Sequence, residues 1–172
     1  GWKERLAGSG ERIELSWRDG ETLRLPERIA LFPDRQLNRD LYLWLVALSA
    51  VNVDERLPWI VRNQAATTTT LARFPGLESR YYRLVEALLP LRVAPESLSG
   101  NEAAQEAAIR QALQQPGSVS VLPSSSKPFR PVPLWSHPSP PVSAASKAAL
   151  SDGAPEREQT DNKNIAKSRR KH

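Results

Sequence analysis

The distribution of prolines is the feature that most constrains the fold of this chain, because proline interrupts helices and the interior of sheets. Nine of the 15 prolines fall between Pro116 and Pro155. Before Pro116 the apolar residues instead recur at helical spacing. We therefore predict a helical domain at residues 1–116 and a disordered tail, rich in proline and serine, at residues 117–172, whose composition buries too little apolar surface to offset its ordering entropy.

Charge follows the same division. Residues 1–116 carry 15 basic and 15 acidic side chains, whereas residues 117–172 carry nine basic and four acidic ones, which accounts for the whole formal charge of +5. The positive charge therefore belongs to a solvated tail rather than to a folded basic face, which argues against a nucleic-acid partner. The basic run at 167–172 fits a solvated linker best, and a nucleic-acid contact or, in a eukaryote, a nuclear signal stays the alternative.

A β-hairpin is predicted at residues 12–25, where apolar and polar residues alternate on both sides of Asp19 and Gly20. A two-residue Asp-Gly turn would move Leu23 to the opposite face from the other apolar residues. A three-residue loop with Gly20 left-handed pairs Leu15 with Leu23, and we favour that register. A single hairpin is marginal alone, so it must pack on the rest of the domain.

About four helices should form the body of the domain. The first is capped by Asn38 and ends near Val51; residues 41–48 are apolar on every side, which predicts a helix buried all round, with Trp44 in the core. Three further helices are predicted, each with the residues that fall on one stripe in parentheses: a helix capped by Asp54 with Pro58 in its first turn (57, 60, 61, 64, 68 and 71), a helix that Pro90 ends or kinks (77, 81, 84, 85, 88 and 91), and residues 101–115 (104, 108, 109, 112 and 113). Trp17 and Trp59 should be half exposed.

One segment of the tail departs from its polar surroundings. Residues 127–136 place Phe129, Leu134 and Trp135 among prolines, in a sequence that favours polyproline II structure. An unfolded segment gains nothing from a lone tryptophan, so these three residues are candidates for docking in a groove, either of this chain or of a partner.

Catalytic chemistry has few candidate residues. The chain has no cysteine, and its two histidines, His137 and His172, both lie in the predicted tail. Carboxylate pairs such as Asp34 with Asp40, or Glu78 with Glu86, are better explained as surface ion pairs with nearby arginines. Residues 8–10 are too short for a phosphate-binding loop. We therefore predict a protein that is not an enzyme, with no catalytic, cofactor-binding or metal-binding residue.

The length of the apolar runs and the residue usage bear on where the protein is located in the cell. The longest apolar run, at residues 41–48, is too short to cross a bilayer, so neither a signal sequence nor membrane insertion is expected. A chain that opens on Gly1 and contains no methionine is expected to be a fragment of a longer protein. Arginine-rich usage before residue 116 suggests a bacterium, and a cytoplasmic location is predicted.

Several strings, in order along nearly the whole chain, resemble the amino-terminal region of the NorD family of accessory proteins for nitric oxide reductase activation, and of the related CbbO family, which acts on Rubisco. The strings are residues 17–26 (WRDGETLRLP), 29–34 (IALFPD), 37–44 (LNRDLYLW), 62–65 (RNQA), 72–77 (ARFPGL) and 131–135 (PVPLW).

The resemblance implies the partners. These families work with a hexameric MoxR-type AAA+ ATPase and carry a carboxy-terminal von Willebrand factor A domain with a metal-ion-dependent adhesion site. In this chain that metal site is expected to lie outside the sequence, beyond the basic tail. The resemblance therefore implies an adaptor that connects the ATPase to a target, nitric oxide reductase for a NorD-like protein or Rubisco for a CbbO-like one.

Overall fold

The fold is seen in a computed structural model, which describes residues 15–19, 22–25 and 29–137. This part of the chain contains four α-helices and one two-stranded antiparallel ribbon, so the predicted mainly helical class is confirmed. The elements are β1 (Trp17–Asp19), β2 (Thr22–Arg24), α2 (Arg35–Ser49), α3 (Trp59–Arg73), α4 (Glu78–Leu88) and α5 (Gly100–Gln114), with short 3-10 turns at Pro75–Leu77, Leu89–Leu91 and Pro95–Ser97. None of the described helices is long and apolar enough to cross a bilayer.

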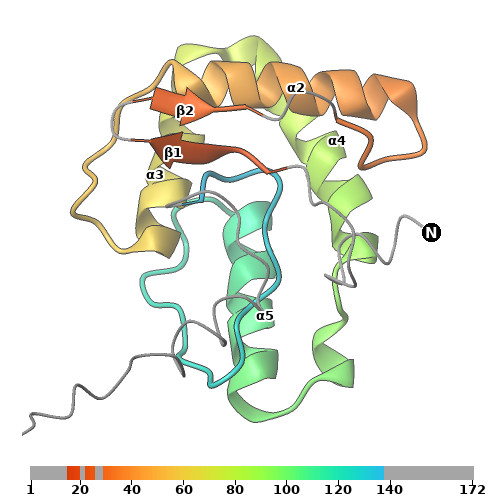
Figure 1. Ribbon diagram of the computed structural model, residues 1–172, viewed down its shortest axis with the longest axis vertical. Helices are drawn as coiled ribbons and strands as arrows, with labels where there is room; N and C mark the ends of the chain where they lie inside the picture. The colour runs from red at the N-terminus through yellow and green to blue at the C-terminus, as the bar shows by residue number, and fades with distance from the viewer. Residues whose placement is uncertain (1–14, 20–21, 26–28, 138–172) are drawn as a thin grey trace, which may run out of the picture.

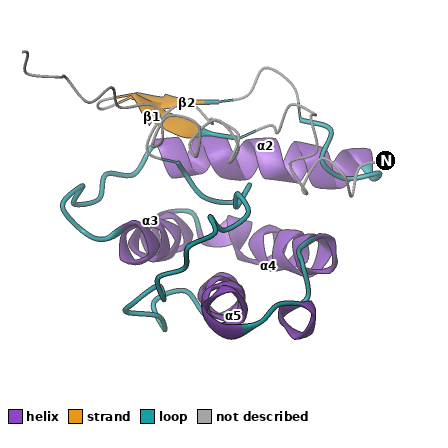
Figure 2. Ribbon diagram, turned by 60° about the horizontal axis from the view of Figure 1, so that its bottom comes forward, coloured by secondary structure: helices purple, strands orange, loops and turns teal. Residues whose placement is uncertain are grey.

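The elements are stacked in layers. Figure 2 shows the β1–β2 ribbon on one side of α2, and α3 and α4 on the other side, with α5 farthest from the ribbon. α2 contacts both α3 and α4, and α5 contacts the same two helices. Trp44 of α2 and Tyr81 of α4 meet in the middle of this stack, with ring centroids 4.7 Å apart. Trp44 is buried, as predicted, and the hydrophobic core lies between the helices around this pair.

The predicted hairpin register is wrong. β1 and β2 pair with Trp17 opposite Arg24 and Asp19 opposite Thr22, so Gly20 and Glu21 are the two residues between the strands. The prediction placed the connection too early in the sequence. A two-residue connection that begins with glycine is itself a favoured hairpin pattern. Residues 12–14 of the predicted hairpin, and residues 20 and 21, lie outside the described part of the chain.

The first helix begins earlier than predicted. Asp34, rather than Asn38, caps α2 by accepting a hydrogen bond from the backbone N–H of Gln36 at 2.7 Å. The Asn38 side chain instead bonds the backbone N–H and C=O of Phe32, at 2.9 and 2.8 Å. A side-chain amide carries both a donor and an acceptor, so it can bond the N–H and the C=O of one residue, and here it fixes the bend before the helix. α2 ends at Ser49.

The next helix also differs from the prediction, both in its cap and in its buried face. α3 begins directly after Pro58, whereas Asp54 caps the preceding turn by accepting from the backbone N–H of Arg56. The face of α3 that is buried is largely polar, and its members are Ile60, Asn63, Gln64, Ala66, Thr67 and Thr70. Thr67 and Thr70 donate to backbone carbonyls one turn back, which satisfies their hydroxyl groups inside the helix.

The last two helices match the sequence pattern. Tyr81, Leu84, Val85 and Leu88 of α4 are buried as predicted, and the helix gives way to the 3-10 turn that contains Pro90. α5 lies within one residue of its predicted bounds and buries Ile109, Ala112 and Leu113, although Ala104 is exposed. The 3.6-residue period finds the apolar part of both buried faces, but α5 also buries Gln105 and Glu106, which the period did not predict.

Candidate functional site: a strap held by two tryptophans and a buried ion pair

The chain does not leave the helical domain at residue 117. Residues 117–137, which we call the strap, run beside α5 and then back toward β1 (Figure 1). Gly117 has a φ of +93°, a conformation that glycine adopts at little cost, where the chain turns away from α5. At the other end, the N–H of His137 donates to the carbonyl of Ser16 at 3.2 Å. The predicted boundary at residue 117 therefore cuts through the described fold, and residues 138–172 of the predicted tail lie outside the described part.

Apolar side chains of the strap complete the core. Val132, Leu134 and Trp135 are 0%, 1% and 0% exposed. Phe129 is half-buried and stacks on Trp59 of α3 with ring centroids 4.5 Å apart, while Trp135 meets Trp59 edge-on at 5.3 Å. The three predicted docking residues, Phe129, Leu134 and Trp135, thus all contact the chain's own domain. As placed here, Leu134 and Trp135 offer no surface to a separate partner.

Two tryptophan side chains hold the strap backbone. The indole N–H of Trp44 donates to the carbonyl of Leu134 at 2.9 Å, and that of Trp59 donates to the carbonyl of Ser136 at 3.1 Å. Asn63 completes the contact by accepting from the N–H of Ser136 at 3.0 Å. This part of the strap belongs to no helix or strand, and its one internal backbone bond is that from the N–H of Trp135 to the carbonyl of Val132 at 3.1 Å, so the helix side chains supply bonds for its other backbone groups.

The polar face of α3 serves the same purpose at the start of the strap. Gln64 accepts from the backbone N–H groups of Gly117 and Val119, at 2.9 and 3.0 Å, and its amide donates back to the carbonyl of Val119 at 2.8 Å. The buried amides of Asn63 and Gln64 are therefore explained by partners more than 50 residues away in the sequence. Local periodicity contains no signal for such contacts.

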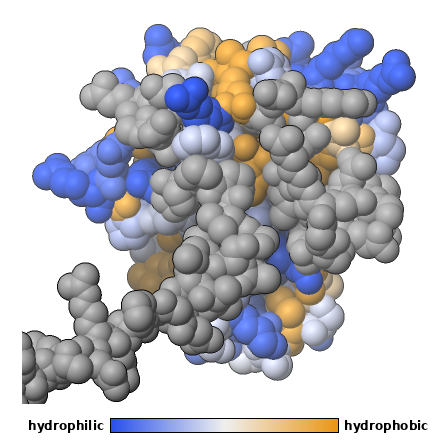
Figure 3. Space-filling view, viewed as in Figure 1, coloured by the Kyte–Doolittle hydropathy of each residue, from blue (hydrophilic) through white to orange (hydrophobic). Residues whose placement is uncertain are grey.

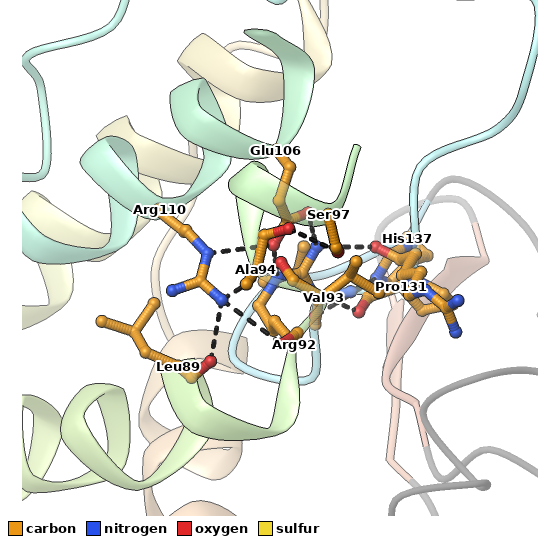
Figure 4. Close-up of polar contacts among 11 residues, drawn as sticks. Leu89, Arg92, Val93, Ala94, Ser97, Glu106, Arg110, Pro131 and His137 are labelled. Atoms are coloured by element: carbon orange, nitrogen blue, oxygen red, sulfur yellow. Dashed lines mark hydrogen bonds and ion pairs between the residues drawn. The ribbon is translucent and has the colours of Figure 1, made fainter. Parts of the chain in front are cut away.

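A buried ion pair anchors the middle of the strap. Arg92, directly after the 3-10 turn that follows α4, forms a two-pronged pair with Glu106 of α5 through its Nε and Nη2 atoms, at 2.7 and 2.8 Å. Its Nη1 also donates to the carbonyl of Pro131 at 2.8 Å, and Nη2 to that of Arg130 at 3.2 Å. Figure 4 shows Arg92 between Glu106 and Pro131. One guanidinium group therefore joins α5 to the strap.

A second arginine extends this cluster. Arg110 lies one turn after Glu106 on α5, with 3.4 Å between its Nε and the Glu106 carboxylate. Its Nη2 donates to the carbonyls of Leu89, Arg92 and Val93 (Figure 4). A planar guanidinium with five donors suits this kind of multiple contact. The cluster holds α5, the strap and the segment after α4 together. Its one carboxylate, Glu106, lies beside both guanidinium groups.

The carboxylates singled out from the sequence lie in different environments. Asp34 is an exposed helix cap, and Glu78 and Glu86 are exposed on α4. Asp40 is 4% exposed, so its interpretation as a surface group is wrong: it accepts from the Gln36 amide at 3.0 Å and lies 3.7 Å from Arg80. Within residues 15–137, gaps excepted, no group of three or more His, Cys, Asp or Glu side chains could hold a metal ion.

Two titratable side chains, those of His137 and Tyr81, contact backbone groups of distant or neighbouring segments. His137, which we predicted to lie in an unfolded tail, is next to Trp59, and its Nε2 lies 3.2 to 3.3 Å from the backbone groups of Val132. The hydroxyl of Tyr81 donates to the carbonyl of Leu113 at 2.7 Å, and burial raises the pKa of this phenol well above its ordinary value. Sequence reasoning found the burial of Tyr81 but not its partner.

The prediction that α2 is buried all round is wrong. Its inner face packs in the core through Leu41, Trp44, Leu45 and Leu48, while Tyr42, Leu43 and Val46 are 46%, 40% and 39% exposed. These three side chains lie outside the core, and we call the side of α2 that carries them its outer face.

Comparison with known proteins identifies relatives of this chain. Protein NorD of Stutzerimonas stutzeri is 43% identical over 135 residues, which cover 78% of this chain and 22% of that protein. Protein NorD of Brucella abortus is 37% identical over 156 residues, covering 78% and 24%. An uncharacterized protein of Pseudomonas aeruginosa is 41% identical over 137 residues, covering 80% and 22%.

The chain therefore spans less than a quarter of the length of these relatives. No family model matches it, and no solved structure does. Similarity to two proteins of the same name, along more than three quarters of the chain, nevertheless confirms what the ordered strings indicated. Over the matched residues, the chain is NorD-like.

Proposed function

We propose that this chain is the non-catalytic helical region of a NorD-like accessory protein, which works in the cytoplasm with a MoxR-type AAA+ ATPase to activate or mature nitric oxide reductase. The observation that carries the proposal is the 43% and 37% identity to proteins named NorD. The partners and the target come from the family resemblance of the sequence strings. In this role the region connects the ATPase to its target.

The strap supports a mechanical role. A protein that connects an ATPase motor to its target must transmit force without unfolding. The strap is the last described segment of the domain, and the chain continues from it to residue 138 and beyond. Its backbone is bonded to α2 and α3 through the two tryptophans and to α5 through Arg92 and Glu106. Force applied beyond residue 137 would therefore act on several elements together.

The test of this proposal uses the complete protein that contains this chain. Co-expression with the tagged MoxR-type ATPase of the same organism should recover a complex that persists at micromolar concentration. In cells that lack the complete protein, nitric oxide reduction should fall, and the wild-type gene should restore it. A complete protein that fails to bind the ATPase, and whose loss leaves nitric oxide reduction unchanged, would exclude this function.

A further inference from the structure

The outer face of α2 combines two features that are each unfavourable for a helix that serves only as structure. The first is apolar exposure. Five large hydrophobic side chains are exposed in the described part of the chain, and three of them, Tyr42, Leu43 and Val46, lie within little more than one turn of α2. Single exposed apolar residues are ordinary, but a cluster on one helical turn marks a surface suited to a partner.

The second feature is charge at the wrong end of the helix. Arg35 and Arg39 are exposed in the first two turns of α2, and no acidic residue lies in its first turn. The amino-terminal end of a helix carries a partial positive charge, so arginine there costs stability, whereas an acid would contribute to it. Neither arginine takes part in an ion pair with another described residue.

These two features are adjacent. Arg39 is three residues before Tyr42 and four before Leu43, spacings that put side chains side by side on a helix. Figure 3 shows the same order along the upper edge of the molecule, with hydrophilic residues over the beginning of α2 and hydrophobic ones over its middle. The result is a surface with a basic end and an apolar centre.

From this arrangement we infer that the outer face of α2, consisting of Arg35, Arg39, Tyr42, Leu43 and Val46, is a docking surface for a partner protein that presents acidic residues beside an apolar patch. Charge complementarity selects this occupant. A second copy of the chain would present the same five residues, which include no acid that could pair with the arginines. A helix that lies on an anionic membrane carries basic residues along its polar face, whereas α2 has both arginines at one end.

The test uses the complete protein, with the MoxR-type ATPase as the first probe; only that choice of probe rests on the proposed function. Two changes remove the features separately: Val46→Ser removes apolar surface, and Arg39→Glu reverses a charge. Arg39 is exposed and forms no ion pair with another described residue, so the second variant should fold as well as the wild type. Each has a matched control away from α2: Val121→Ser at a side chain 73% exposed, and Arg83→Glu at an exposed arginine of α4 that forms no ion pair with another described residue.

We expect each α2 variant to weaken the dissociation constant by about tenfold, the size typical of a significant interface residue, and the controls to leave it within about twofold. The loss from Arg39→Glu should shrink as salt rises, because salt screens an exposed charge contact. If the ATPase binds the wild type and all four variants equally, the proposed function stands, the ATPase is not the partner at the α2 surface, and the crosslinking measurement described next decides the inference.

If the ATPase does not bind the wild type, the proposed function fails and a second measurement decides the inference. A photocrosslinking residue at position 42 of the complete protein should then form an adduct in cells with a protein whose affinity, measured after purification, falls with Arg39→Glu. Adducts only with a second copy or with lipid, or with a protein insensitive to that change, would overturn the inference, as would the absence of an adduct.

Discussion

The strap and the outer face of α2 differ in opposite directions from the burial predicted for them. The strap comes from a proline-rich sequence predicted to be unfolded, yet it contributes Val132, Leu134 and Trp135 to the core. α2 contains the most apolar run of the chain, predicted to be buried on every side, yet Tyr42, Leu43 and Val46 face solvent. The composition of a segment therefore does not fix its burial, which depends on the neighbouring elements against which the fold packs it.

This comparison assigns different roles to the two sets of apolar residues. Those of the strap stabilise the domain, since they fill the space against α2 and α3 and their backbone is hydrogen-bonded to Trp44 and Trp59. Those on the outer face of α2 contribute little to the fold and are free to contact another molecule. Substitutions should therefore affect stability in the first region and binding in the second.

The largest single-residue effect is expected for Trp135→Ala. This side chain is fully buried against Trp59, so its removal leaves a cavity and loses the transfer free energy of the indole. The free energy of unfolding of the 172-residue chain should fall by about 4 kcal/mol, measured by urea denaturation. A loss below about 1 kcal/mol would mean that the strap is not part of the core.

The buried ion pair should come next. Glu106→Gln leaves Arg92 and Arg110 without their carboxylate, and uncompensated buried charge typically costs about 3 kcal/mol. Glu86→Gln, at an exposed position of α4, is the control and should change the free energy of unfolding by less than about 0.5 kcal/mol. Equal effects of the two substitutions would show that the Arg92 contact does not anchor the strap.

A smaller effect is expected for Tyr81→Phe. Losing the 2.7 Å bond to the Leu113 carbonyl should cost about 1 kcal/mol at neutral pH. Because burial raises the pKa of Tyr81, both states are protonated below about pH 10, and above it the unfolded state ionises first. Stability should therefore decline as pH rises above about 10, and less steeply in Tyr81→Phe. Tyr42→Phe, which removes the hydroxyl of an exposed tyrosine, is the control for the loss at neutral pH.

The smallest effect on stability should come from the outer face of α2. Val46→Ser replaces an isopropyl group that is already 39% exposed by a smaller polar group. The free energy of unfolding should therefore change by no more than about 0.5 kcal/mol. Thermal unfolding of this variant beside Trp135→Ala gives the sharpest contrast between the two regions. A loss as large as that of the strap variant would assign Val46 to the core.

The sequence predicted best those elements whose contacts are local. The stripe of Tyr81, Leu84, Val85 and Leu88 on α4 follows the helical period, and Pro90 interrupts the helix where expected. The bounds of α5 were predicted for the same reason. On α4 the buried face is apolar throughout, and on α5 the apolar residues Ile109, Ala112 and Leu113 follow the period, whereas the burial of Gln105 and Glu106 beside them does not follow from periodicity.

Prediction failed where the partner is distant in sequence. Asn63 and Gln64 are polar, and nothing near them shows that Ser136 and Gly117 will complete their hydrogen bonds. Arg92 and Glu106 appear as two ordinary charges until the 3-10 turn and α5 bring them together with Pro131. The lone tryptophan among prolines suggested docking on this chain or on a partner, and only the fold shows that Trp135 is buried in the core of this chain.

The most direct measurement compares chains that end after residue 137 and after residue 116, using circular dichroism during urea denaturation. If the strap is an integral part of the helical domain, the chain ending at 137 should unfold in one cooperative transition. The chain ending at 116, which lacks Val132, Leu134 and Trp135, should show none. A chain ending at 116 that unfolds cooperatively, with the same midpoint as the longer one, would contradict this account.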